Sequence, residues 1–341
     1  MESSPHASPA GPPASPIDWP RFAELIRANR RFALTSHVRP DCDAVGSELG
    51  MAFILERLGK EAKIINPFEV PPNLRFIDPE GKLQSLGSDG TREWIESIDV
   101  LMVLDTTAWA QLGDMGDVVR TTRATKMVLD HHPSGDDLGA ELFKDPSAEA
   151  TGRLVVEAAE HLGVQLVPQV AQALFAAMAT DTGWFRFNST SARTYQMAAQ
   201  LTAAGANPAR IYKDLYENET LTRLQLVGRA MARTRTELDG RLIHTWLARD
   251  DFDATGALPQ DSEDVINLTL AVGGTEVAVI LVEQLGGGFK ISFRSRFDVD
   301  CRLVAEQFGG GGHRNASGAL VTEPFAVAQS MVLDAVRAAM Q

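Results

Sequence analysis

Residues 34–47 (LTSHVRPDCDAVGS) place a histidine and two aspartates close together in the sequence. His37, Asp41 and Asp43 carry an imidazole and two carboxylates, side chains that proteins use to bind metal ions. Two carboxylates crowded into one short turn repel each other unless a cation lies among them. The segment therefore predicts a cation site, and further ligands for it are expected elsewhere in the chain.

The same residue types recur where apolar runs end further along the sequence. The additional candidates are Asp105, Asp130, His131, His132 and Asp181. Oxygen and imidazole ligands without a thiolate favour Mn²⁺ or Mg²⁺ over structural zinc.

The charges of these residues indicate the reaction. The aspartates at positions 41, 43, 105 and 181 bring four negative charges, which two divalent cations would balance. A single cation would leave the site strongly anionic, and the site would then repel a phosphate group. Two metal ions about 3.5–4 Å apart deprotonate a water and neutralise charge on a phosphoryl oxygen. We therefore expect the hydrolysis of a phosphoester.

The apolar runs before these polar residues predict the strands of a parallel sheet. Residues 32–34 lead into the first segment, 98–105 (IDVLMVLD) form a nearly unbroken apolar run, and 125–132 (TKMVLDHH) repeat that form. Continuously apolar strands are typical of parallel sheets that are covered on both faces. Because ligands bind at the carboxyl ends of such strands, we expect the polar residues to face one crevice.

Helical patterns follow these strands. Apolar residues at 45, 49, 52 and 53 indicate a helix that leaves the first segment, with Gly59 at its C-terminal end. Helices are also expected over about 149–163 and 168–182, and the second of these delivers Asp181. Residues 61–66 are expected to form a short strand.

The pattern of expected elements changes at about residue 238, where a second series of strands and helices begins. The strands expected beyond it are 241–248, 276–283 and 289–293, with glycines 286–288 as a hairpin turn, and the helices are 263–271, 300–307 and 325–340. We predict an α/β protein in which a cleft separates an N-terminal parallel-sheet domain from a smaller C-terminal α/β domain. The expected divisions are a disordered tail at 1–17, a catalytic domain at 18–190, a helical connector at 191–237 and a substrate-binding domain at 238–341.

Composition narrows the class of protein. The formal net charge of −13 over 341 residues argues against processive binding of long nucleic acid, which favours basic proteins. No apolar run approaches the roughly 20 residues that span a bilayer, so no membrane partner is expected. Residues 1–17 are rich in Pro, Ser and Ala and lack the features of a signal peptide. The two cysteines provide no disulfide framework, and a reducing cytoplasm is the expected compartment.

A glycine-rich segment of the second domain is a candidate for binding a phosphate. In GGGGHRNASG (309–318) the glycines, Gly311 and Gly312 among them, leave backbone N–H groups open to an anion. His313 and Arg314 follow directly and add side-chain donors.

Other basic and aromatic residues are further candidates. Arg294 and Arg296 alternate at the end of a strand and so share one face, where a guanidinium binds a terminal phosphate through two hydrogen bonds. In the first domain Trp184, Phe185 and Arg186 lie close to Asp181, and the rings are candidates for stacking on a base.

Five segments resemble the motifs of the DHH phosphoesterase family. Four of them are HVRPDCDAVGS, VLD at 103–105, LDHH at 129–132 and ATDTGWFRF at 179–187, and GGGGHRNASG resembles the signature of the DHH-associated C-terminal domain. They occur in the order and spacing of the family and span about residues 25–335. Within the family the chain is most similar to the bacterial oligoribonucleases that also hydrolyse 3′-phosphoadenosine 5′-phosphate (PAP).

The resemblance implies a role for each candidate residue. The implied metal ligands are His37 and Asp41 for one manganese ion, Asp43, His131 and Asp181 for a second, and Asp105 as a bridge between the two. His132 would face the substrate phosphate, and Asp130 would accept an imidazole N–H and fix its tautomer. Cys42 stands where the family needs no ligand and is expected to be a small packed residue.

The resemblance also implies a substrate class. Di- to pentanucleotides of RNA would be cut to 5′-mononucleotides and PAP to AMP, with the scissile phosphate on the first domain and a neighbouring phosphate or nucleotide end on the second. The sequence does not rank linear dinucleotides, cyclic dinucleotides and PAP as substrates. It also leaves open RNA against DNA, Mg²⁺ or Co²⁺ in place of Mn²⁺, and a homodimer.

Several alternatives share parts of the pattern. A cyclic di-AMP phosphodiesterase has the same motifs. A RecJ-like exonuclease usually brings extra domains, and a family II inorganic pyrophosphatase is not expected to carry GGGGH. From another class, an RNA-binding module without catalysis would fit the C-terminal segment, which has a relative in alanyl-tRNA synthetases. The full set of metal ligands argues against a role in binding alone.

Overall fold

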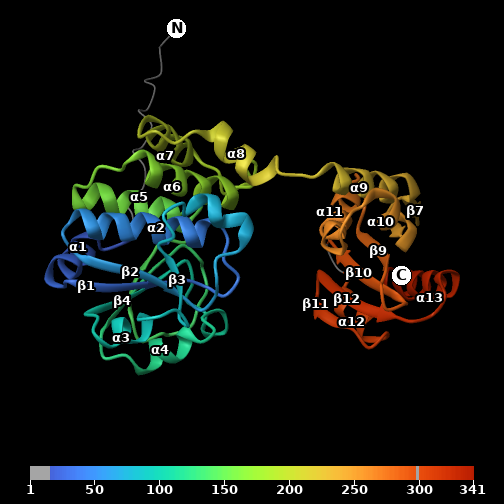
Figure 1. Cartoon of the computed structure of the whole chain (residues 1–341), viewed down its shortest axis with the longest axis horizontal. Helices are drawn as coiled ribbons and strands as arrows, with labels where there is room; N and C mark the ends of the chain where they lie inside the picture. Colours follow the sequence, from blue (N-terminus) through green and yellow to red (C-terminus); the bar gives the residue numbers. More distant parts are fainter. Residues whose placement is uncertain (1–15, 297–298) are drawn as a thin grey trace, which may run out of the picture. The chain divides into compact units, whose positions relative to one another are not determined.

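The computed structural model describes residues 16–296 and 299–341, and the chain divides into two compact units between Glu217 and Asn218 (Figure 1). Each unit has its own sheet. Residues 1–15 of the expected tail lie outside the described residues, whereas Ile17 is buried in the hydrophobic core of the first unit.

The first unit contains a six-stranded sheet in which all neighbouring strands are parallel. In sheet order the strands are β3 (Leu83–Ser85), β2 (Glu61–Asn66), β1 (Arg31–Thr35), β4 (Val100–Leu104), β5 (Thr125–Asp130) and β6 (Glu141–Lys144). The three apolar runs of the sequence form β1, β4 and β5, which are neighbours. Their carboxyl ends therefore lie side by side, as predicted.

Helices cover both faces of this sheet, which explains why its central strands are apolar throughout (Figure 1). The helices are α1 (Trp19–Ala28), α2 (Cys42–Arg57), α3 (Thr91–Glu96), α4 (Met115–Thr121), α5 (Thr151–Leu162), α6 (Pro168–Asp181), α7 (Ala192–Ala203) and α8 (Pro208–Tyr216), with 3-10 turns η1 (Pro72–Ile77) and η2 (Trp109–Gln111). In β4, Met102 and Leu104 pack into the core with α2, α5 and α6, whereas Leu101 and Val103 pack into a second core with α4.

Helix α2 packs tightly against α6. A Cβ at Gly46 would stand 2.5 Å from the carbonyl oxygen of Ala173 on α6, so only glycine permits this approach. The contact fixes the first turn of α2, which bears Asp43, relative to the end of α6, where Asp181 lies.

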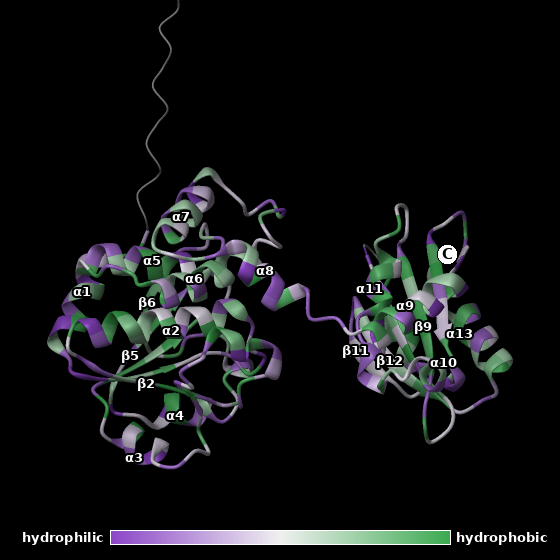
Figure 2. Ribbon diagram, turned by 45° about the horizontal axis from the view of Figure 1, so that its top comes forward, coloured by the Kyte–Doolittle hydropathy of each residue, from purple (hydrophilic) through white to green (hydrophobic). Residues whose placement is uncertain are grey.

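The second unit contains a mixed six-stranded sheet, with apolar residues concentrated in its strands (Figure 2). In sheet order the strands are β11 (Gly311–His313), β12 (Ala316–Val321), β10 (Phe289–Ser295), β9 (Val277–Glu283), β8 (Leu242–Leu247) and β7 (Arg235–Glu237). Strands β8 and β9 run parallel, and the other neighbouring pairs are antiparallel. Its helices are α9 (Leu221–Arg233), α10 (Arg249–Thr255), α11 (Val265–Leu270), α12 (Cys301–Glu306) and α13 (Phe325–Ala339), with the 3-10 turn η3 (Pro259–Ser262).

Most of the predicted elements are present within a few residues of their expected ends. Glycines 286–288 connect the antiparallel strands β9 and β10, as the hairpin pattern predicted. The helices that were not predicted are α1, α3, α4 and α10, and the strands that were not predicted are β3, β6, β7, β11 and β12. The expected connector at 191–237 contains three helices: α7 and α8 precede the division between the units, and α9 follows it. The domain boundaries stay a prediction.

Part of the glycine-rich segment is closed to an anion by backbone hydrogen bonds and strand pairing. Gly311 to His313 form β11, which pairs with β12. The N–H groups of Gly309 and Gly310 donate to the carbonyl oxygens of Glu306 and Ala305 at the end of α12, so these two amides are not open to an anion. A Cβ at Gly310 would stand 2.1 Å from the carbonyl oxygen of Gly318, so close backbone packing requires glycine here.

Two further features bear on the class of protein. Within the described part of the chain, none of the helices has both the length and the apolar character of a membrane span. Cys42 and Cys301 are buried free thiols, and Cys42 is packed in the core of the first unit as expected.

Candidate metal centre

The strand ends and two helix ends of the first unit bring the expected metal ligands together. His37, Asp105 and His131 follow β1, β4 and β5, whereas Asp41 and Asp43 begin α2 and Asp181 ends α6. A cavity of about 370 Å³ opens among them, lined by His37, Val38, Arg39, Asp41, Asp105, Ala110, Gln111, His131, His132 and Asp181.

The ligand atoms fall into groups with the spacing of metal sites. The groups are His37 with Asp41 and Asp105, Asp43 with His131 and Asp181, and Asp105 with His131 and His132, each with its ligand atoms within 4.8 Å of one another. The first two groups match the two sets that the family resemblance implied, and Asp105 belongs to the first set and to the third group.

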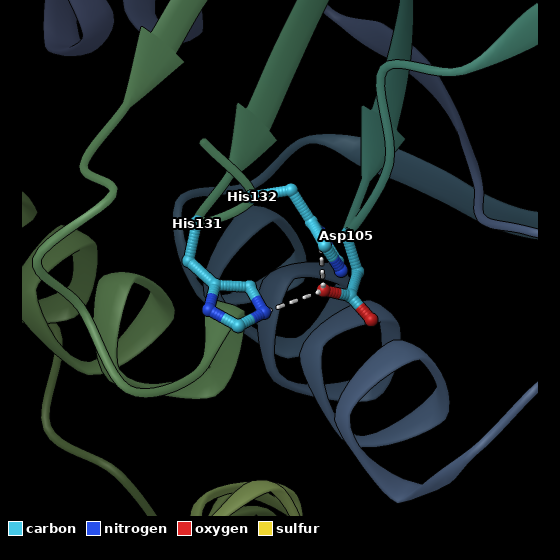
Figure 3. A group of neighbouring side chains, drawn as sticks. All are labelled: Asp105, His131 and His132. Carbon is cyan, nitrogen blue, oxygen red and sulfur yellow. Dashed lines mark ion pairs between the residues drawn. The ribbon is translucent and has the colours of Figure 1, made fainter. Parts of the chain in front are cut away.

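Asp105 lies between the two sets. Its Oδ2 is 3.3 Å from Nε2 of His37, and its Oδ1 is 3.5 Å from Nε2 of His131. Figure 3 shows His131 and His132 both directed at this carboxylate. The backbone of Asp105 is left-handed, with φ of 62°, a conformation that costs energy for a residue with a side chain. One oxygen toward each set is the arrangement that a bridging ligand needs.

The N-terminus of α5 holds two of the carboxylates in place. The N–H groups of Thr151 and Gly152 donate to the two oxygens of Asp43 at 2.7 and 2.8 Å, and the hydroxyl of Thr151 donates to Asp105 at 2.9 Å. Helix N-termini stabilise carboxylates in this way. Neither residue was predicted to contact the site, because backbone donors leave no signal in the sequence beyond the start of a helical pattern.

Hydrogen bonds also orient the two neighbouring histidines. Nδ1 of His131 lies 3.2 Å from the carbonyl oxygen of Ala148, so it carries the proton and leaves Nε2 as the ligand atom. Nδ1 of His132 lies 2.8 Å from Asp130, which also pairs with Lys144 at 3.0 Å. Asp130 therefore makes the contact to an imidazole that the resemblance implied.

The electrostatics of the cavity fit a site for cations. Burial raises the pKa values of Asp43 and Asp105, and repulsion from the other aspartates raises them further. Burial and the charge of Asp41 raise the pKa of Asp181 to about 6. Burial would also raise the pKa of Asp130, but bonds from His132 and Lys144 outweigh it and lower that pKa to about 2. The first three carboxylates need added positive charge to ionise together, and oxygen and imidazole donors suit divalent cations.

The remaining candidates lie outside these groups. Trp184 and Phe185 form edge contacts with Phe175 and pack against the core, whereas the guanidinium of the exposed Arg186 donates to the carbonyl oxygen of Gly183.

The second-unit candidates lie on its surface. His313 and Arg314 are exposed, as are Gly311 and Gly312 in the same strand and turn. Arg294 is half-buried, and Arg296, which lies just beyond β10, is exposed. Phe293 and Ser295, which alternate with them, are buried, as the alternation predicted. Their binding role stays a prediction.

Two cavity residues with polar side chains were not among the predicted site residues. Arg39 lies inside the first motif and Gln111 ends η2, and both line the cavity. The arginine is visible in HVRPD, but nothing in the sequence places Gln111 near it.

Comparison with known proteins identifies both units. The family model described as "DHH family, N-terminal domain" matches residues 31–178, and the DHHA1 domain matches residues 252–341. The protein named bifunctional oligoribonuclease and PAP phosphatase NrnA from Thermus thermophilus is 30% identical over 318 residues, covering 92% of this chain and 92% of that protein.

Two further proteins resemble the chain. The cyclic-di-AMP phosphodiesterase GdpP from Geobacillus thermodenitrificans is 25% identical, and the match covers 88% of this chain but 46% of that protein. Among solved structures, an exopolyphosphatase-related protein from Bacteroides fragilis matches with a TM-score of 0.78 and 26% identity, covering 94% of this chain and 95% of that one.

Proposed function

Because the chain belongs to the DHH family, we propose that it is a two-manganese phosphodiesterase that hydrolyses short oligoribonucleotides to 5′-mononucleotides and PAP to AMP. The observation that carries this proposal is the pair of ligand sets that meet at Asp105. The relative from Thermus thermophilus, which matches over nearly its whole length, is named for both activities.

We assign the chain's own residues to distinct tasks. His37 and Asp41 would hold one ion, Asp43, His131 and Asp181 would hold the other, and Asp105 would contribute to both sites. When bound, the ions activate a water and neutralise the scissile phosphate. His132 uses Nδ1 to bond Asp130, which leaves Nε2 to hold a proton for the phosphate or the leaving oxygen.

The second unit is proposed to recognise a neighbouring phosphate or the end of the nucleotide chain. His313, Arg314 and Arg296 are exposed and supply charged or polar donors on one small domain. Binding of a neighbouring phosphate by the second unit would favour short substrates. The net charge of −13 supports this, because a long strand would meet a repulsive surface.

A cyclic di-AMP phosphodiesterase is the second candidate, favoured by the likeness to GdpP. That match covers less than half of GdpP, so its activity transfers less directly than that of the relative matched over nearly its full length.

A panel of three substrates tests the proposal. With Mn²⁺, the chain is expected to release AMP from the linear dinucleotide pApA and from PAP, and a chelator should abolish both reactions until Mn²⁺ is restored. Hydrolysis of cyclic di-AMP at least tenfold faster than of pApA would favour the second candidate instead. Calorimetric titration with Mn²⁺ is expected to give two ions per chain, and one ion would overturn the two-metal assignment.

A further inference from the structure

Two neighbouring segments line the cavity but contribute no residue to the ligand sets. Val38 and Arg39 follow His37, and Ala110 and Gln111 belong to η2. The N–H of Val38 donates to the carbonyl oxygen of Gln111 at 2.7 Å, which joins the segments. We call Arg39 and Gln111 the donor rim, because their side chains are the polar ones that these two segments contribute.

The charge of Arg39 is not used inside the protein. Its side chain is exposed, and among the described residues it has neither an ion pair nor a side-chain hydrogen bond. This is notable because Asp41, Asp105 and Asp181 line the same cavity. A guanidinium that lines an acidic cavity without pairing to its carboxylates is available to an anion that enters from solvent.

A hydrogen-bond chain orients the amide of Gln111. The N–H of Ala108 donates to the hydroxyl oxygen of Thr106 at 3.2 Å, and that hydroxyl donates to Oε1 of Gln111 at 3.2 Å. The reverse orientation of the amide would leave the hydroxyl proton of Thr106 without this acceptor. Nε2 of Gln111 therefore keeps its two N–H groups, for which the described residues provide no acceptor.

The balance of charge indicates which anion the donor rim receives. The carboxylates of Asp41, Asp43, Asp105 and Asp181 carry four negative charges, which the two proposed divalent ions cancel. A phosphodiester that enters the cavity then brings one negative charge without a partner. Arg39 supplies one positive charge on the wall of the same cavity, whose volume is about 370 Å³.

We propose that Arg39 and Gln111 bind a non-bridging oxygen of the scissile phosphate, and this rests on the proposed function. Neither residue belongs to a ligand set, so both side chains stay available to the phosphate while the carboxylates and histidines hold the ions. Charge accumulates on these oxygens as water attacks, so the rim binds the transition state more tightly than the substrate. Arg39 is then a catalytic residue, and Gln111 assists it.

Variants of the donor rim test this with pApA as substrate and Mn²⁺ as metal. Arg39→Met keeps much of the apolar stem and is expected to lower kcat about 100-fold, the typical cost of one transition-state donor. Arg39→Lys should recover part of that loss, and Gln111→Met should lower kcat about tenfold, because a neutral donor contributes less. Inorganic phosphate, which needs no turnover, should inhibit Arg39→Met about tenfold more weakly than the wild type, while Mn²⁺ affinity stays unchanged.

Arg123→Met is the matched control. Arg123 is also exposed, but it precedes β5 and lines a different cavity at the amino ends of the strands, so its loss should leave kcat unchanged. No turnover by the wild type would overturn the proposed function itself. Turnover by the wild type with equal kcat for Arg39→Met and Arg123→Met would overturn the donor rim alone. A rise in KM without a fall in kcat, or a loss of Mn²⁺ binding in Arg39→Met, would also contradict it.

Discussion

Asp105 lies between the two ligand sets and contacts a histidine of each. Its two oxygens face different histidines, and its left-handed backbone is held by the hydroxyl bond from Thr151 and by a backbone bond to Leu129. A short apolar strand that ends in a carboxylate is common, so sequence alone indicates only that the residue is a candidate. The position of β4 between β1 and β5 gives Asp105 its place between the two histidines.

Asp105→Asn is expected to lower kcat/KM for pApA at least about 100-fold, since it keeps the shape and removes the charge that both ions share. Calorimetric titration should show Mn²⁺ affinity about tenfold weaker or lower. Asp117→Asn is the control, because Asp117 is exposed on α4 and, among the residues that the structure describes, its side chain pairs with Arg120 alone. An Asp105→Asn variant that keeps tens of per cent of wild-type activity would exclude this carboxylate from the site.

Glu48 and Asn66 connect three elements behind the metal ligands. The amide of Asn66 at the end of β2 donates to Glu48 on α2 at 2.9 Å, and its oxygen accepts the N–H of Ser36 at 3.0 Å. Ser36 precedes His37, so the pair supports the strand end that carries this ligand. Both side chains are fully buried, and burial raises the pKa of Glu48 to about 8.

This buried carboxyl predicts a pH dependence of stability. The folded chain keeps a proton that the unfolded chain releases above the ordinary pKa of 4.5, so the contribution of Glu48 to stability is lost as pH rises toward about 8. Glu48→Gln keeps the neutral shape, so its stability relative to the wild type should rise by up to about 1.4 kcal/mol per pH unit in that window. Urea unfolding at several pH values measures the difference, and parallel curves for the two proteins would show that Glu48 is ionised when buried.

At the scale of elements, the predictable part of the fold is the part with local signals. Continuous apolar runs identified β1, β4 and β5, and the helical spacing after Asp43 identified α2. Helix α5 was also predicted, but its contact with Asp43 was not, because the donors are backbone N–H groups. Strand β11 was not predicted for a related reason. Its glycines alone resemble a loop, and only the pairing with β12 makes the segment a strand.

Gly152→Ala tests how closely α5 must approach the site. A Cβ there would stand 2.7 Å from the Cβ of Ala177 and 3.2 Å from an oxygen of Asp43, so the variant should lose about 1–3 kcal/mol of stability. Mn²⁺ should also bind more weakly, because the shift moves a ligand.

Gly228→Ala is the matched control for this substitution. Gly228 lies exposed in α9 with open space around its Cβ position, and alanine should stabilise the helix by about 0.5–1 kcal/mol. Urea unfolding of both variants gives the comparison. A Gly152→Ala variant as stable as the wild type, with unchanged Mn²⁺ affinity, would show that α5 is free to shift.

At the scale of the whole molecule, the parallel topology explains why ligands far apart in sequence were predictable as a group. Each crossover returns the chain to the same edge, so residues that follow different strands meet there. No such rule relates the candidates on the second unit to that edge. Their part in the reaction is therefore tested by comparing the hydrolysis rates of substrates of different length.

The last prediction concerns substrate length. If the second unit binds a neighbouring phosphate, di- to pentanucleotides should be hydrolysed faster than a long single strand at equal concentrations of ends. Arg314→Ala should then raise KM for pApA about tenfold and change kcat little, because a remote contact stabilises substrate and transition state equally. Arg302→Ala is the control, since Arg302 on α12 pairs with Asp300 and Glu306. Equal rates on long and short strands, or a fall in kcat alone for Arg314→Ala, would remove the second unit from the selection of substrate length.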